Sequence, residues 1–438
     1  MSHSQFALLK QRKFLPLFLT QFMGAGNDNV LKNAMVILIT FQAAKLQVSN
    51  PALWVNLCAG IFILPMFLFS ATAGQLADKY EKSRIVRWVK LIEIGIMFIA
   101  GAGFLLPDLT LLMVALFLMG MHSTLFGPVK YSILPQHLAD NELVAGNALV
   151  ESGTFLAILL GTILGGTLAG MGDAGATYAA IATASIAVIG YLCSRSIPLA
   201  PAAAPDLNIN WNPVSETIRN VRFAKQNRRV FLSIIGISWF WFYGAVFLSQ
   251  FPGFAKLHLA GNEHVVTLLL ALFSIGIGVG SLMCDKLSHQ HVEVGLVPLG
   301  ALGLTLFAVD LFFAAPAQTI AAPQDIGAFF HTAGSYRVVL DLMMIGVSGG
   351  LYCVPLYAMM QAESDPAYRS RMIATNNIMN AFFMVIAAAF AISLLAAKFS
   401  ILQIFLFTGL LNACVALYLL VGLPACRQGL INLFIRKA

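Results

Sequence analysis

A cluster of polar and charged side chains lies in the middle of the first apolar stretch of the chain. Residues 14–41 are long enough to span a bilayer, but their centre contains Asn27, Asp28, Asn29, Lys32 and Asn33. A charged side chain at the centre of a membrane helix costs about 2.5–3.5 kcal/mol. Groups placed there at such a cost are expected to face a cavity, a partner or a substrate.

The spacing of Asp28 and Lys32 suggests the chemistry. Residues four apart share one face of a helix, so this pair offers a carboxylate and an ammonium side by side. A zwitterionic ethanolamine phosphate would match it, with its ammonium on Asp28 and its phosphate on Lys32 or Lys130. The alternative is an internal ion pair that only neutralises the two charges.

Three further residues are candidates for the same cavity. Lys130 and Tyr131 close the fourth apolar stretch, and Glu151 lies well inside the fifth. A lysine at a span end can also extend its ammonium to the membrane surface, and Glu151 can pair with a lysine of another span. We predict that Asp28, Asn29, Lys32, Asn33, Lys130, Tyr131 and Glu151 bind substrate.

A second charged cluster lies at a predicted helix end. Asp78 and Lys79 end the second apolar stretch, and Arg84 follows in the next loop. We predict a gating role for these three residues, with Asp78 forming a charge lock that is broken and remade as access alternates. Ordinary topology signalling by the loop cations is the alternative.

The elements that carry these residues are membrane spans. Hydrophobic residues make up 59% of the chain and charged residues 10%, whereas a soluble domain has roughly 25% charged residues. Apolar runs predict twelve transmembrane helices: an N-terminal six-helix bundle at 1–197, a cytoplasmic linker at 198–229 and a C-terminal six-helix bundle at 230–438. In the linker, Trp211, Val214, Ile218 and Val221 recur at helical spacing, which predicts an amphipathic helix on the inner membrane surface.

Charge sets the orientation and excludes several functions. With both termini cytoplasmic, most loop lysines and arginines lie inside, as expected for an inner-membrane protein; outside stand only Lys45, Lys256, Arg337 and Lys398. The net charge of +7 fits this bias, and we predict no nucleic-acid partner. No nucleophile with a paired base, no metal-ligand spacing and no phosphate-binding loop appears. We therefore expect no enzyme activity, no cofactor and no metal.

The two halves of the chain echo each other. Gly74 and Asp78-Lys79 end the second span, while Gly280 and Asp285-Lys286 end the eighth. The fifth span opens with Ala145-Gly146-Asn147 and the eleventh with Ala374-Thr375-Asn376. A parallel repeat of six spans is typical of a two-bundle transporter with its site between the bundles.

The chain resembles the major facilitator superfamily, and within it the lysophospholipid transporter family. G-Q-L-A-D-K-Y-E-K-S-R (Gly74 to Arg84) is similar to the superfamily motif between the second and third spans. Four stretches resemble the narrower family: Q-F-M-G-A-G-N-D-N (Gln21 to Asn29), G-P-V-K-Y-S-I-L (Gly127 to Leu134), A-G-N-A-L-V-E-S-G-T (Ala145 to Thr154) and V-P-L-Y-A-M-M-Q (Val354 to Gln361). The first is also close to transporter domains fused to an acyltransferase and an acyl-ACP synthetase.

The resemblance implies a transporter that moves lysophosphatidylethanolamine and lysophosphatidylglycerol to the inner leaflet for reacylation. Its partners would be this substrate and the membrane lipids, and a separate acyltransferase or acyl-ACP synthetase stays open as another. One departure is that the seventh span, from Trp239 to Leu248, lacks the arginine that unfused family members carry. We expect the cargo to enter sideways from the bilayer, with its acyl chain near this aromatic stretch.

Two other functions remain open from the residues. A proton-coupled antiporter of drugs or small metabolites on the same fold would use Asp28 or Glu151 as the titrating group. A membrane scaffold for an acyltransferase would transport nothing. Transport that depends on a proton gradient would identify the antiporter, and movement of lysophospholipid by the isolated protein would exclude the scaffold.

Overall fold

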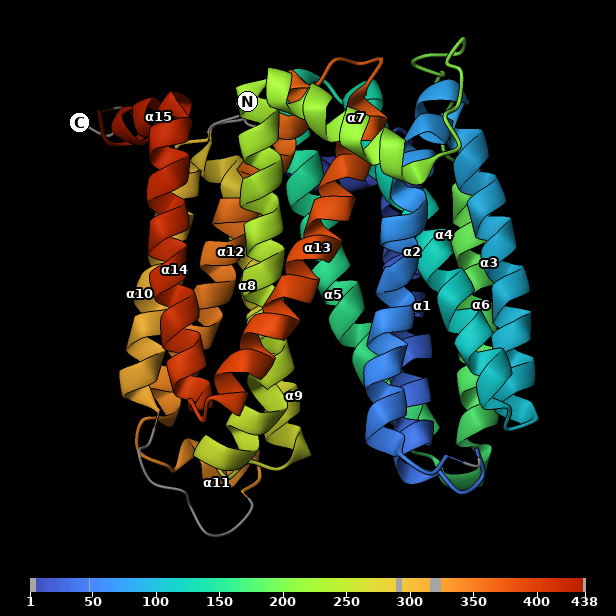
Figure 1. Ribbon diagram of the computed structural model, residues 1–438, viewed down its shortest axis with the longest axis vertical. Coiled ribbons are helices and arrows are strands. Elements are labelled where there is room, and N and C mark those ends of the chain that lie inside the picture. Colours follow the sequence, from blue (N-terminus) through green and yellow to red (C-terminus); the bar gives the residue numbers. More distant parts are fainter. Residues whose placement is uncertain (1–4, 47, 289–293, 316–323, 436–438) are drawn as a thin grey trace. The chain divides into compact units, whose positions relative to one another are not determined.

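The computed structural model describes residues 5–46, 48–288, 294–315 and 324–435, and these residues contain helices and no strand. Within each of its two compact units the long helices run along a common direction (Figure 1). The helices are α1 (Leu15–Phe41), α2 (Pro51–Lys79), α3 (Lys82–Leu105), α4 (Leu109–His137), α5 (Leu143–Ala169), α6 (Gly175–Ser194), α7 (Pro213–Gln226), α8 (Arg228–His258), α9 (Glu263–Leu287), α10 (Leu296–Ala314), α11 (Ile326–Phe330), α12 (Ser335–Glu363), α13 (Arg369–Ala396), α14 (Ile401–Gly422) and α15 (Pro424–Ile435), with 3-10 turns at Gln5–Lys10, Asp140–Glu142 and Gly172–Ala174.

Polar caps fix where several helices begin. The side chains of Asn50, Asp108, Asn227 and Asn262 accept hydrogen bonds from the first backbone N–H groups of α2, α4, α8 and α9. Ser400 opens α14 with a reciprocal capping box. These caps satisfy donors that the first turn of a helix leaves without an intrahelical partner.

The membrane-spanning character predicted from composition is confirmed. Within the described residues, eleven helices are long and apolar enough to cross a membrane. The 27-residue α1 is not among them, because its polar centre lowers its hydropathy. With α1 counted by length, the predicted twelve helices are all present.

The first compact unit comprises Met1–Ala139, Leu156–Ala224 and Ser364–Ile378. In it α1 packs on α6, α6 on α3, α3 on α4 and α4 on α2. A buried apolar core runs through these helices, with Met35, Ile96, Phe104 and Met119 among its members. The carboxyl-terminal half of α5 and the first turns of α13 also belong to this unit.

The second compact unit comprises Asp140–Phe155, Lys225–Glu363 and Met379–Ala438. Here α8 packs on α14, α14 on α10, α10 on α12 and α12 on α9. Each of these pairs is the equivalent, one six-span repeat later, of a pair in the first unit. The repeat seen in the sequence is therefore also a repeat of packing.

Small residues let the most closely packed helices of the second unit approach. Gly276 and Gly280 of α9 face Gly346 and Gly350 of α12, and a Cβ added at any of the four would stand within 2.5 Å of a backbone atom of the other helix. Glycines four apart are a common device for close helix contact in membranes. This spacing positions α12 against α9 along the second unit.

Candidate functional site

The polar centre of α1 sends its side chains to several neighbouring helices of the first unit. Asp28 is half-buried, and its Oδ2 accepts a 2.8 Å hydrogen bond from Ser123 Oγ of α4. Its Oδ1 is buried and has no hydrogen-bond partner within the described residues. Lys32 Nζ lies 5.2 Å from the centre of the Phe62 ring of α2.

Asp28 and Lys32 do not form the internal ion pair considered from the sequence. The ion pairs within 4.0 Å among the described residues include neither side chain. Asp28 is instead bound by a neutral hydroxyl, and Lys32 faces an aromatic ring. Neither side chain is therefore held in a direct ion pair with another described residue.

Asn29 and Asn33 of α1 lie where this helix meets α5. Asn29 Nδ2 donates to Ala25 O at 2.8 Å, within its own helix, and Asn33 Nδ2 donates to Asn29 O at 2.9 Å and to Thr162 Oγ1 at 3.2 Å. Gly161 lies beside them: a Cβ added there would stand 2.4 Å from a backbone oxygen of α1. The glycine thus lets α5 reach the polar centre of α1.

A fully buried charge network includes Asn27, the residue next to Asp28 in the chain. Glu93 Oε2 is 2.5 Å from Lys90 Nζ and 3.2 Å from His122 Nε2, and its Oε1 accepts a 2.7 Å hydrogen bond from Asn27 Nδ2. A Cβ at Gly24 would stand 2.7 Å from Lys90 Nζ, so this glycine of α1 makes room for the buried ammonium. The sequence predicts Lys90 and Glu93 as a structural pair, and the structure adds Asn27 and His122 to it.

The other substrate-binding candidates are distributed over both units. Lys130 and Tyr131 lie in α4 within the first unit, where Lys130 Nζ sits 4.5 Å from the Tyr131 ring centre. Lys130 follows Ser123 by seven residues, about 10 Å along the helix. Glu151 is buried and belongs to the second unit. Four of the seven candidates lie within about a turn and a half of α1: Asp28, Asn29, Lys32 and Asn33.

The aromatic stretch of α8 is mostly core of the second unit. Trp239, Phe240, Phe242 and Tyr243 are buried, and Trp239 Nε1 donates to Asn412 Oδ1 at 2.8 Å. Trp241 is only partly buried and stacks on Phe155 of α5, with ring centres 6.4 Å apart. Trp241 is thus the member of this stretch best placed to contact an apolar ligand.

The predicted gating residue Asp78 has a partner that sequence reasoning missed. Its Oδ2 accepts a hydrogen bond from Arg371 Nε at 3.0 Å, and its Oδ1 accepts one from Ser370 N at 3.1 Å. Both charged side chains are buried. Arg371 Nη2 also donates to Ala367 O at 2.8 Å, and its guanidinium lies 3.8 Å from the Tyr368 ring centre. In the sequence, Arg371 is only one of many loop cations, and a pairing across so many residues leaves no local signal.

Lys79 and Arg84 do not share the ion pair of Asp78. Lys79 Nζ donates to Leu207 O at 2.8 Å, so it holds the segment that precedes α7. The Arg84 side chain is exposed, and its backbone N–H donates to Glu81 Oε2 at 2.7 Å.

Glu81 caps α3 and also ties down the chain beyond α6. It accepts hydrogen bonds from the backbone N–H groups of Ser83, Arg84 and Ala200. Partial burial opposes ionisation of Glu81, but these hydrogen bonds outweigh it and hold the pKa of this carboxyl below its usual range. The cap is therefore an ionised one at neutral pH.

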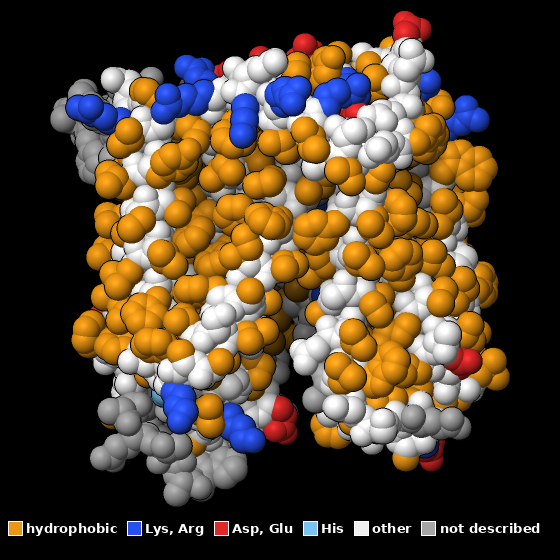
Figure 2. Space-filling model, viewed as in Figure 1, with side chains coloured by type: hydrophobic (Ala, Val, Ile, Leu, Met, Phe, Trp, Pro, Cys, Tyr) orange, Lys and Arg blue, Asp and Glu red, His pale blue; other side chains and the backbone are white. Residues whose placement is uncertain are grey.

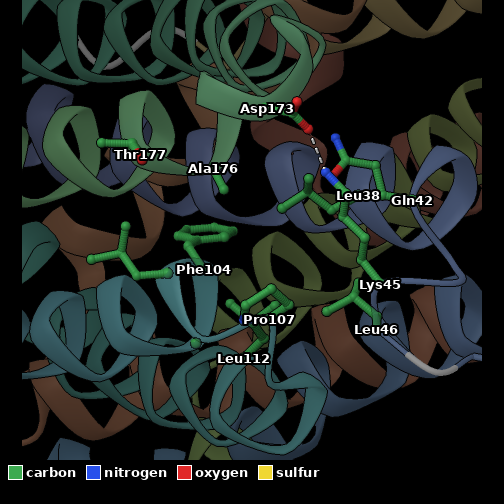
Figure 3. A pocket seen from close by; sticks show the side chains of 12 residues that line it. Leu38, Gln42, Lys45, Leu46, Phe104, Pro107, Leu112, Asp173, Ala176 and Thr177 are labelled. Carbon is green, nitrogen blue, oxygen red and sulfur yellow. Dashed lines mark hydrogen bonds and ion pairs between the residues drawn. The ribbon is translucent and has the colours of Figure 1, made fainter.

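A cavity of about 130 Å³ lies at the carboxyl-terminal end of α1, away from the predicted site (Figure 3). Phe104 and Leu112 line it, and the ion pair between Lys45 and Asp173 lies at its edge with 2.7 Å between Nζ and Oδ1. None of the predicted substrate-binding residues lines it. Within the described residues, no group of three or more His, Cys, Asp or Glu side chains could hold a metal ion.

Twelve long helices in the described part of the chain, a six-span repeat in both sequence and packing, and charges held at the centre of one span define a polytopic membrane transporter. A family comparison makes this specific. Residues 17–335 match the model of the Major Facilitator Superfamily, and the chain belongs to that family.

Curated relatives align over most of the chain. It is 28% identical over 350 residues to the lysophospholipid transporter LplT of Escherichia fergusonii, covering 79% of each protein. It is 28% identical over 367 residues to the LplT of Cronobacter sakazakii, covering 82% of this chain and 83% of that one. These relatives are transporters, which agrees with the prediction that the chain is not an enzyme.

Solved structures share the fold. A bacterial homologue of the iron transporter ferroportin in its outward-facing state has a TM-score of 0.67 at 16% identity, covering 93% of this chain and 99% of that one. The human organic anion transporter MFSD10 has a TM-score of 0.70 at 12% identity, covering 92% of this chain and 99% of that one. At these identities the likeness concerns the fold alone.

Proposed function

We propose that the chain transports lysophospholipids, moving lysophosphatidylethanolamine and lysophosphatidylglycerol across the inner membrane to the cytoplasmic leaflet for reacylation. Membership of a transporter superfamily supports the transport activity. Curated relatives that carry the name lysophospholipid transporter over about four-fifths of the chain support the substrate class.

The observation that carries the proposal is the free carboxylate oxygen of Asp28. A buried polar atom without a partner is rare in a native protein and calls for an explanation. Among the residues that the structure describes, Asp28 Oδ1 is such an atom, at the centre of a membrane helix. An ethanolamine ammonium would supply the missing partner, and Lys32 or Lys130 would take the phosphate.

The remaining substrate-binding residues complete this arrangement. Asn29 and Asn33 would offer carboxamides to the glycerol hydroxyl and phosphate oxygens. Tyr131 supports Lys130 through its ring, and Glu151 would contribute from α5. Lysophosphatidylglycerol has no ammonium, so it would depend more on the lysines and asparagines than on Asp28.

The bundles at 1–197 and 230–438, joined by the linker at 198–229, would alternate access around this site. Asp78 would act as the charge lock with Arg371 as its partner, and Lys79 and Arg84 would hold the neighbouring loop. Both termini would be cytoplasmic, as the distribution of loop cations favours. The cargo would enter sideways, since its acyl chain partitions into lipid, and a separate acyltransferase or acyl-ACP synthetase would use the delivered product.

The test is transport of labelled lysophosphatidylethanolamine by the purified protein in vesicles. Asp28→Asn keeps the shape of the side chain and removes its charge, so we expect transport to fall by the equivalent of about 2–5 kcal/mol. Asp206→Asn, on an exposed residue of the linker, is the matched control and should transport as the unmodified protein does. Unchanged transport by Asp28→Asn at normal protein levels would make Asp28 a structural residue.

Competition separates this function from the antiporter. Lysophospholipids should compete well with the labelled substrate, and glycerophosphoethanolamine, which has the head group but no acyl chain, should compete poorly. Equal competition by the chainless compound, or transport that collapses with the proton gradient, would overturn the proposal. No movement of lysophospholipid by the isolated protein would favour a scaffold.

A further inference from the structure

The short helix α7 buries polar residues and exposes apolar ones, which is the reverse of an ordinary surface helix. Its polar residues Glu216 and Asn220 are buried against the protein, while Val214 and Ile218 are 66% and 55% exposed, and Trp211 just before the helix is 70% exposed. An apolar group of this kind on a surface marks a site that something else covers.

One stripe of exposed residues on α7 combines apolar and basic side chains. Val214, Ile218, Arg222 and Lys225 follow one another at spacings of four, four and three residues, so they stand on one face of the helix, and all four are exposed. We call these four residues, with Trp211, the outward stripe. It is apolar at its beginning and basic at its end.

The setting of the outward stripe fits a lipid surface. In Figure 1, α7 lies across the end of α2 instead of parallel to it, and in Figure 2 blue and orange side chains lie side by side in the region of α7. Trp and aliphatic side chains beside Lys and Arg are typical of helices that lie in the interface of an anionic membrane. The phosphates of the lipid would attract Arg222 and Lys225, while the apolar residues would enter the acyl-chain boundary.

The segment that carries α7 is tied to one side of the Asp78 pair. Gln75, one turn before Asp78 in α2, exchanges two hydrogen bonds with the backbone of Asn210, at 2.9 and 2.7 Å. The backbone carbonyl of Asp78 accepts from Ala203 N and Ala204 N at 2.9 and 2.8 Å. A displacement of α7 would therefore act on the end of α2.

A second connection reaches the other side of the pair. Phe223 of α7 stacks on Tyr368, with ring centres 4.1 Å apart. Tyr368 in turn lies under the guanidinium of Arg371, which binds Asp78. The helix is thus connected to both partners of the buried ion pair, to Asp78 through the linker and to Arg371 through the ring of Tyr368.

We propose that the outward stripe of α7 docks on the anionic phospholipid surface of the membrane, and that this contact holds the Asp78–Arg371 pair together. The docking does not depend on the proposed transport function, whereas the effect on the ion pair rests on it. Anionic phospholipid is thereby a regulatory partner of the gate, separate from the transported lysophospholipid.

Tryptophan fluorescence tests the docking without any transport measurement. The full-length protein is placed in vesicles of brominated phosphatidylglycerol or brominated phosphatidylcholine, and the quenching is compared with that of Trp211→Phe. We expect the Trp211 signal to be quenched more by the anionic lipid. Trp88, exposed in the membrane span α3, supplies the control through Trp88→Phe, since its signal should be quenched equally by both lipids. No quenching of Trp211 in either lipid would overturn the docking and point to a protein that covers the stripe.

Charge removal tests the preference for anionic lipid. Arg222→Gln with Lys225→Gln should lose the difference between the two lipids, by about fivefold for each cation removed. Arg195→Gln, an exposed cation outside α7, should keep it. An unchanged preference in the double variant would overturn the electrostatic part of the proposal.

The link to the gate is tested with Phe223→Ala. Transport by the unmodified protein should depend on the phosphatidylglycerol content of the vesicle, and Phe223→Ala should transport at a rate that does not change with it while Trp211 is still quenched. A retained dependence in Phe223→Ala would overturn the link. If the unmodified protein moves no lysophospholipid in any vesicle, the proposed function fails, and the quenching result still decides the docking.

Discussion

Replacing Asp78 by Asn should separate turnover from substrate binding. The carboxylate of Asp78 is fully buried and is bound by Arg371 and by the backbone N–H of Ser370. Asparagine keeps an oxygen for the backbone donor but leaves the Arg371 guanidinium buried without a counter-charge. Removing one partner of a buried ion pair costs about 3–5 kcal/mol.

That cost falls on the conformation in which the pair is formed. Each 1.4 kcal/mol changes an equilibrium tenfold, so the population of this conformation should fall by roughly a hundredfold to a few thousandfold relative to one without the pair. Turnover should decrease strongly because the transporter must revisit both conformations. The polar centre of α1 is not altered, so the concentration for half-maximal transport should change much less.

The assay is the initial rate of lysophospholipid transport over a range of substrate concentrations, with protein amount matched. Arg371→Gln and the double variant complete a cycle: the double variant should be no slower than the slower single variant, because both remove the same interaction. A variant of Asp78 that loses affinity but keeps its maximal rate would refute the gating role. Additive effects of the two substitutions would refute the pairing as its cause.

Three further outcomes follow from the packing and charges of the first unit. Gly161→Ala should lower the thermal unfolding temperature, because the added Cβ would stand 2.4 Å from a backbone oxygen of α1; Gly166→Ala, with nothing within 4 Å of its Cβ, should be neutral or slightly stabilising. Glu93→Gln should destabilise the protein by about 3–5 kcal/mol, because the Lys90 ammonium stays buried without a carboxylate, as measured by unfolding in detergent; equal stability would contradict a stabilising role for this pair. The pKa of Glu81 is lower in the folded protein than in the unfolded chain. Ionised Glu81 therefore stabilises the fold at pH values above its unfolded-state pKa, and this stabilisation is lost as the pH falls through its folded-state pKa. Glu81→Gln should remove this part of the acid dependence of stability, and an unchanged dependence of stability on pH would contradict the prediction.

The sequence alone determined that the chain is a multi-pass helical membrane protein, and it singled out the polar centre of α1. Hydropathy and loop charge depend on composition over windows of about 20 residues, and no tertiary contact is needed to read them. The polar centre of α1 stood out for the same reason, since Asp28 and Lys32 are costly wherever the helix packs. The repeat of six spans also appeared in the sequence, because the same turn and helix-end chemistry recurs in both halves.

Tertiary structure decided which groups meet. Asp78 and Asp28 bind partners from helices far along the chain, and Asn27 and His122 reach Glu93 from other helices, so no local pattern links them. The structure leaves Arg222 and Lys225 exposed on the same side of α7 as Val214 and Ile218, whereas Val221 is only partly exposed. Only the packing of Glu216 against the protein shows which side of that helix faces out, because an amphipathic pattern has two faces and the neighbours choose which is buried.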